Sequence, residues 1–244
     1  MAQQSPNIVR SEIHEGYSII YMDDGKNNLV SPSMIVQLNA ALDEAEQRNH
    51  VVVLTGRAEV FSAGFDLAIL KTGVRNTFDM LMGGFKLARR LLAFPKPVII
   101  ACNGHAIAMG TFILLSGDYR IGAKGPYKLV ANEVEIGLTM PYSAVEICRQ
   151  RLRPAVLDRA VLLSECFIPD AAIDAGFLDQ VVEHQYVLNV AREKAEQFAQ
   201  LDLNAHEQSK QRLRGDMLKA MDKAIDADRR DFVVKGVKRV LKIA

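Results

Sequence analysis

Two short, uninterrupted apolar runs place the strongest constraint on how this chain can fold. Residues 51–56, VVVLTG, and residues 98–104, VIIACNG, are rich in β-branched residues and each contains a closing glycine. Runs of this kind are typical of strands buried on both faces, as in parallel sheets covered by helices. Patterns with helical spacing precede them at 32–47 and 77–92. Because helix and strand alternate, the sequence predicts a stacked α/β fold.

The rest of the chain continues this pattern and then changes character. At 244 residues, the length favours one main domain. We expect a core over residues 1–190 and a charged, amphipathic, helical C-terminal region over 191–244. The remaining predicted elements are a hairpin over 8–22, a strand at 118–121, a long helix over 142–160, and helices at 187–198 and 207–241.

Composition excludes several classes of function. Thirty Lys and Arg residues balance 29 Asp and Glu residues, so the net charge of +1 offers no global attraction to nucleic acid or to an anionic membrane. No apolar run is long enough to span a bilayer, and the N-terminus lacks the pattern of an export signal. Three widely spaced cysteines indicate neither a disulfide framework nor a metal site. We therefore expect a cytoplasmic protein without a metal.

Glycine-containing turns follow two of the predicted strand regions. They lie in the segments FSAGFDL (61–67) and NGHAIAMG (103–110). Turns of this kind leave backbone N–H groups unpaired, and a following helix adds positive potential, so together they could hold one negative oxygen. Neither segment matches the dinucleotide or P-loop phosphate signature. A single turn of this kind more often has a structural role than a ligand-binding one.

Five segments of the chain, taken in order, resemble the crotonase (enoyl-CoA hydratase/isomerase) superfamily. They are HVVVLTG, FSAGFDL, KPVIIACNGHAIAMG, GDYRIGA and NEVEIGLTMP. The resemblance extends over about residues 8–182. It implies a spiral of ββα units, with the helical C-terminal region serving oligomerisation in a homotrimer or a dimer of trimers. It also implies an acyl-CoA thioester as substrate, with no further cofactor.

The resemblance assigns roles to particular residues of the two turns. In the family, two backbone N–H groups hold the thioester oxygen, and the matching positions here are Phe65 and Met109. Because the main chain supplies these donors, the large side chains do not remove them. Further expected substrate contacts, from the same segments and from the loop that resembles the family's nucleotide-binding region, are Ala63, Asp66, Leu67, Gly110 and Lys26.

Acid–base groups determine which reaction is expected. Hydratases of the family have two glutamates, and the position of the first is occupied here by Phe112, which we expect to form an apolar substrate-binding wall. The second is retained as Glu133. A single carboxyl favours an enoyl-CoA isomerase, in which Glu133 moves a proton from C2 to C4, because hydration must also hold a water molecule. The alternatives are a hydratase with a non-standard second group and a non-catalytic acyl-CoA-binding protein.

Other ionisable residues near these segments are weaker candidates for a catalytic role. Glu135 is the reserve base, and Asp66 is expected to cap the following helix. His105 is expected to be structural, and Tyr127 and Tyr142 are minor candidates for proton donors or pocket walls. A flexible acyl pocket is expected from the apolar residues Leu67, Ile69, Leu70, Met80, Leu81, Met82 and Phe85.

Overall fold

A six-stranded sheet forms the centre of the molecule. The computed structural model describes residues 6–241, with side-chain surroundings up to residue 234. The sheet order is β1-β2-β3-β5-β7-β9; the predicted hairpin β1–β2 is antiparallel and every other pair is parallel. The strands are β1 (Val9–Ile13), β2 (Tyr17–Met22), β3 (Val51–Thr55), β5 (Val98–Cys102), β7 (Tyr119–Lys124) and β9 (Gln180–Glu183).

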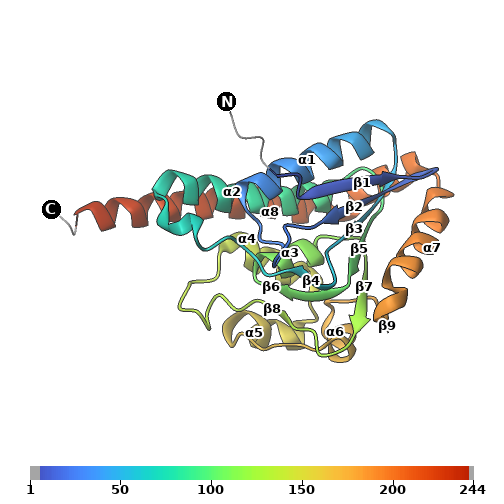
Figure 1. Ribbon diagram of the computed structural model, residues 1–244. Helices are drawn as coiled ribbons and strands as arrows, with labels where there is room; N and C mark the ends of the chain where they lie inside the picture. The colour runs from blue at the N-terminus through green and yellow to red at the C-terminus, as the bar shows by residue number, and fades with distance from the viewer. Residues whose placement is uncertain (1–5, 242–244) are drawn as a thin grey trace.

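Helices cover both faces of this sheet, as the continuous apolar strands require (Figure 1). Val53 and Ile99 face one side and pack with α7 (Val187–Ala199). Val52 and Leu54 face the other side, where they join the larger core. The helices of that side are α1 (Pro32–Gln47), α2 (Val74–Ala93), α3 (Met109–Leu115) and α8 (Leu203–Leu241).

A second, three-stranded sheet was not predicted. It contains β4 (Glu59–Ser62), β6 (Gly104–Ile107) and β8 (Leu129–Val130), all parallel. The chain passes from the first sheet to the second near Gly56 and Gly104. A Cβ atom built on Gly104 would lie 1.9 Å from the Glu59 carbonyl carbon, and one on Gly56 would lie 2.3 Å from the Val60 oxygen. Glycine is therefore required where these backbones meet.

The predicted helix over 142–160 is two helices. The structure has α4 (Tyr142–Arg151) and α5 (Pro154–Leu162), with an extended backbone at Leu152 and Arg153. Pro154 causes the break, because a proline disfavours helical geometry in the residue before it. The other short elements are α6 (Pro169–Ala175) and two 3₁₀ turns, η1 (Ile69–Lys71) and η2 (His184–Tyr186).

The C-terminal helix α8 is packed into the main core. Met217, Met221 and Ile225 are buried in the larger cluster. The expected boundary at residue 190 falls inside α7, which itself covers the central sheet. No helix of the described residues is both long and apolar enough to cross a membrane.

Buried charges fix α8 at the edge of the central sheet. Asp118, just before β7, accepts from Lys210 Nζ at 2.6 Å and lies 2.8 Å from Arg214. Its carboxylate also accepts the Val98 N–H at 2.7 Å. Burial lowers the pKa of Lys210, although the neighbouring Asp118 opposes this effect. Removing the carboxylate would leave two buried cations without their main partner.

We therefore predict that Asp118→Asn lowers the free energy of unfolding by about 3 kcal/mol, the usual cost of breaking a buried ion pair. Urea denaturation followed by circular dichroism measures this change. Asp216→Asn is the matched control, since Asp216 is on α8 but fully exposed, and its effect should stay within about 0.5 kcal/mol. Equal effects of the two variants would contradict the assignment.

Candidate active site

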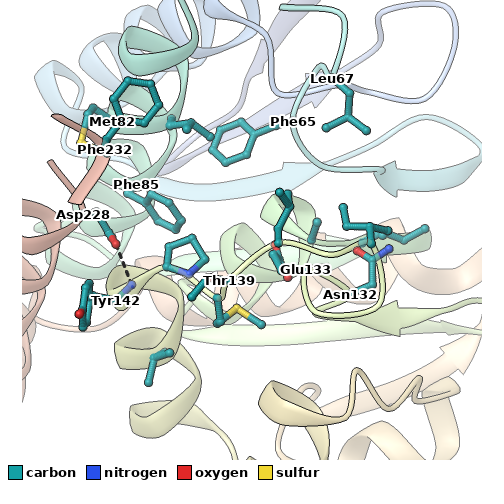
Figure 2. Close-up of a pocket in the computed structure, with 18 of the residues that line it drawn as sticks. Phe65, Leu67, Met82, Phe85, Asn132, Glu133, Thr139, Tyr142, Asp228 and Phe232 are labelled. Carbon is teal, nitrogen blue, oxygen red and sulfur yellow. Dashed lines mark hydrogen bonds between the residues drawn. The ribbon is translucent and has the colours of Figure 1, made fainter. Parts of the chain in front are cut away.

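A cavity of about 1000 Å³ lies between the two glycine turns, the loop after β8 and helices α2, α4 and α8. Figure 2 shows Phe65 and Glu133 projecting from different elements toward this space. Most of the lining side chains are apolar. Among the described residues, no group of histidine, cysteine, aspartate and glutamate side chains could hold a metal ion. The size and mostly apolar lining of the cavity suit it to a largely apolar organic ligand.

The two glycine turns approach each other through their backbones. A Cβ atom built on Gly64 would lie 2.9 Å from the Ile107 oxygen and 3.3 Å from the Met109 nitrogen, and the φ angle of Gly64 is +90°. Within residues 6–241, no turn, loop or cap hydrogen bond uses the N–H of Phe65 or of Met109. Two unused donors thus come from neighbouring segments, one after β4 and one at the start of α3.

Ala108 holds the second turn in a strained conformation. Its φ angle is +50° and its ψ angle is −121°, a region that residues other than glycine rarely adopt. The Ala108 N–H donates to the Val130 oxygen at 2.8 Å, which anchors the turn to β8. Such strain costs about 1–3 kcal/mol and is concentrated at functional sites. Here it occurs directly before the unused Met109 N–H.

Glu133 is a buried carboxyl that lines the cavity. Its Oε2 atom has no hydrogen-bond partner. Burial raises the pKa of Glu133 to about 7, although a hydrogen bond from its own backbone N–H opposes the rise. The Leu138 N–H donates to the Glu133 carbonyl at 2.8 Å, and Gly137 has a φ angle of +79°, so a tight turn holds the residue. A carboxyl with a pKa near 7 can both accept and release a proton near neutral pH.

Aromatic rings form one wall of the cavity. The Phe65 ring lies over Gly84, where a Cβ atom would come within 2.5 Å of it. It also meets Phe85 edge to face, with ring centroids 6.0 Å apart. Phe112, expected to form this wall, lies one layer behind it: its ring is fully buried, 6.2 Å from Phe85, and does not line the cavity. Every residue of α3 is buried, and this places Phe112 in the core.

The other expected substrate contacts divide into two groups. Ala63, Asp66 and Leu67 line the cavity. Lys26 is exposed on its loop and is not part of the lining. Gly110 does not line the cavity either, because it packs against β4, where a Cβ atom would lie 2.3 Å from the Ser62 oxygen.

Asp66 and His105 make local hydrogen bonds. The Asp66 carboxylate accepts the Ala68 N–H at 3.0 Å just before η1, although the short helix itself has no side-chain cap. The His105 Nδ1 accepts the Lys128 N–H at 3.0 Å, which agrees with its expected structural role. Glu135 is exposed and lies outside the cavity lining, as does the buried Tyr127.

Distant parts of the chain complete the cavity. Tyr142, a minor candidate in the sequence, lines it, as does Asn132, whose Oδ1 is buried without a partner. Asp228 and Phe232 on α8 also line it and were not predicted. About 90 residues separate them from Tyr142, and the helical pattern of α8 alone does not indicate which neighbour each side chain contacts. The acyl pocket residues that do line the cavity are Leu67, Leu81, Met82 and Phe85.

The raised pKa of Glu133 predicts how stability depends on pH. An ordinary glutamate ionises near 4.5 and folded Glu133 near 7, so its stabilising contribution is full below pH 4.5 and is lost as the pH rises through 7. We expect Glu133→Gln to be more stable than the wild type by up to about 3 kcal/mol above pH 7. Urea unfolding of both proteins at several pH values between about 5 and 8 measures this difference in the free energy of unfolding. A gap that does not vary with pH would contradict the assignment.

Comparison with known proteins places the chain in a family. The family model of enoyl-CoA hydratases/isomerases matches residues 12–239. The chain is 33% identical over 166 residues to a peroxisomal enoyl-CoA delta isomerase 2 of Arabidopsis thaliana, an alignment that covers 64% of this chain and 69% of the relative.

Solved structures extend the likeness to the whole fold. An enoyl-CoA hydratase from Mycobacterium marinum has a TM-score of 0.89 and 44% identity, covering 92% of this chain and 99% of the other. The human mitochondrial delta3-delta2-enoyl-CoA isomerase has a TM-score of 0.88 and 25% identity, covering 97% and 96%. The predicted crotonase-like fold is thereby confirmed. This chain belongs to the enoyl-CoA hydratase/isomerase family, whose members are enzymes that process acyl-CoA thioesters.

Proposed function

We propose that this protein is an enoyl-CoA isomerase, which converts a 3-enoyl-CoA into a 2-enoyl-CoA. The observation that carries the proposal is the buried carboxyl of Glu133, whose Oε2 has no hydrogen-bond partner, in a cavity lined by Phe65 and by Ala108, the residue before Met109. No turn, loop or cap hydrogen bond of the described residues uses the N–H groups of Phe65 and Met109. Most of the side chains that line this cavity are apolar. Proton transfer within the substrate is the chemistry that such a site performs with the fewest groups.

In the proposed reaction, ionised Glu133 takes a proton from C2 of the substrate. The electrons of the broken C2–H bond form an enolate, whose oxygen accepts hydrogen bonds from the N–H groups of Phe65 and Met109. Glu133 then returns its proton to C4, and the double bond moves from C3–C4 to C2–C3. Each fixed donor stabilises the developing charge, at about 3 kcal/mol in comparable oxyanion sites.

Hydration of a 2-enoyl-CoA is the second candidate. It is favoured by the name of the Mycobacterium marinum hydratase, which is 44% identical to this chain. Against it, the position of the expected second carboxyl is Phe112, a fully buried ring in the core. A hydratase would need another polar group to hold the attacking water. A non-catalytic acyl-CoA-binding protein, the remaining alternative, would need no catalytic group.

Activity assays separate these functions. We expect 3-enoyl-CoA to be isomerised and 2-enoyl-CoA to gain little or no 3-hydroxyacyl product, as measured by chromatography of the thioesters. Glu133→Gln should lower kcat/KM about a thousandfold with little change in acyl-CoA affinity. In the wild type, kcat/KM should rise with pH and level off above pH 7, because the free enzyme must hold Glu133 ionised.

Glu135→Gln is the matched control for this experiment, since Glu135 is exposed two residues away and should change kcat/KM little. Hydration without isomerisation would reject the proposed reaction. Tight binding without turnover of either substrate would identify a non-catalytic protein.

The two proposed backbone donors, Phe65 and Met109, predict how a second substitution changes kcat. In Gly64→Ala, the new Cβ would meet the Ile107 oxygen at 2.9 Å and would also strain the backbone at its φ of +90°. The turns should move apart, so that kcat falls about a hundredfold, as when one oxyanion donor is lost. Gly25→Ala is the control, because it has a similar φ of +77° but no atom within 4 Å of the new Cβ. Equal kcat values for Gly64→Ala and wild type would exclude these donors.

Binding of the rest of coenzyme A and assembly remain part of the proposal. Ala63, Asp66 and Leu67 would contact the thioester arm, because they line the cavity next to Phe65. Lys26, exposed on the preceding loop, would meet the nucleotide. We also propose a homotrimer or dimer of trimers in the cytoplasm. Exposed aliphatic residues at the end of α5, Leu162 and Leu163, are consistent with a subunit contact.

A further inference from the structure

The cavity has two unlike ends on either side of Glu133. Figure 2 shows Leu67 and Asn132 toward one end and Met82, Phe232 and Tyr142 toward the other. The second end is an arm between α2, α4 and α8, where the polar or charged lining residues Tyr142, Arg149, Asp228 and Asp231 lie beside apolar ones. Its apolar lining comprises Leu81, Met82, Phe85, Met140, Val145 and Phe232. An alkyl chain gains affinity by entering such an arm, at about fourfold for each methylene removed from water.

Phe232 lies at the far side of this arm. It is on α8 and packs against Phe78 of α2, with ring centroids 5.4 Å apart. The neighbouring residues Val233 and Val234 are exposed, whereas Phe232 is partly buried and lines the cavity. A chain that extends along the arm from Glu133 toward α8 would therefore meet this ring.

Asp228 fixes the position of this part of α8. Helix α4 begins after Pro141, which has no side chain that can cap the helix. Asp228 supplies the missing cap from α8: it accepts the N–H groups of Tyr142 at 2.7 Å and Ser143 at 2.9 Å, and the Ser143 hydroxyl at 2.6 Å (Figure 2 draws the first of these). Both carboxylate oxygens are used, so α8 is tied to the helix that forms the opposite side of the arm.

We propose that Phe232 limits the length of the acyl chain that this enzyme accepts, and that the Asp228 cap is the positioning contact that holds Phe232 there. The inference rests on the proposed use of the cavity for an acyl thioester. It assigns the distal carbons to the arm between α2, α4 and α8. It also predicts that chain-length preference depends on a residue of α8 that takes no part in proton transfer.

The test measures dissociation constants by calorimetry for saturated acyl-CoA thioesters of increasing chain length. In the wild type, affinity should rise by about fourfold per methylene and stop rising when the chain end reaches Phe232. In Phe232→Ala, this break should move to longer chains, and a chain two methylenes beyond the wild-type break should bind about fifteenfold more tightly than it binds the wild type. Phe232→Trp should move the break to shorter chains.

Asp228→Asn should move the break in the same direction as Phe232→Ala, because the cap weakens and α8 can move away. Two variants of α8 serve as controls. Val233→Ala changes an exposed neighbour of Phe232. Asp222→Asn removes a carboxylate that ties α8 to α2 through Arg89, at 2.7 and 2.9 Å, but does not line the cavity. Neither should move the break.

The outcomes separate this inference from the proposed reaction. A break that stays in place in both folded Phe232 variants would overturn the role of Phe232, even if isomerase activity is found. A break that moves as expected would support it even if no double bond is shifted, because binding of saturated thioesters requires no turnover. A shift with Asp222→Asn equal to that with Asp228→Asn would overturn the positioning role of the Asp228 cap.

Discussion

The close backbone contact between the two strand ends is the constraint on which the site depends. Gly56 and Gly104 lie where the first sheet passes into the second, and neither position has room for a Cβ atom. The Asn103 side chain joins the two turns: its amide donates to the oxygens of Gly56 and Arg57, and its Oδ1 accepts the Gly56 N–H. Parallel pairing of β4 with β6 then brings the following turns together, which is why Gly64 lies against Met109.

Two largely buried carboxyl groups, Asp118 and Glu133, have opposite electrostatic surroundings. Asp118 is surrounded by donors from Lys210, Arg214 and the Val98 backbone, so it fixes α8 to the sheet. Glu133 has an oxygen without a partner, and burial is the main cause of its raised pKa. A carboxylate without a cation is costly to bury, and a fold keeps one mainly where its proton is used. The second arrangement is the one that supports acid–base chemistry.

The central sheet could be predicted because its strands carry their own signal. The runs at 51–55 and 98–102 are apolar at every position except Thr55, and the helix over 32–47 has both a Ser31 cap and a proline in its first turn. The second sheet carries no such signal, since β8 has two residues and β6 begins with the glycine of a turn. Its pairing is dictated by contacts between segments far apart in the sequence, which local patterns do not contain.

The site was predictable to the extent that its groups follow one another along the chain. Phe65 and Glu133 could be placed from their segments, but the depth of each side chain could not. Phe112 shows the difference: its match to the family's first glutamate position was available from the sequence, whereas its position behind Phe85 depends on how α3 is buried. The same limit applies to α8, whose residues reach the cavity only through tertiary packing.

The position of Phe112 bears on the choice between isomerase and hydratase in a way that the sequence did not indicate. If the Phe112 ring lined the cavity, a water molecule could still bind beside it. The Phe112 ring is fully buried behind Phe85, so the position of the family's first glutamate supplies no polar group to the cavity lining. The cavity wall at Phe85 is then apolar through two layers, from Phe85 to Phe112. Holding a nucleophilic water there would require a hydrogen-bonding partner on that side, and neither aromatic ring supplies one.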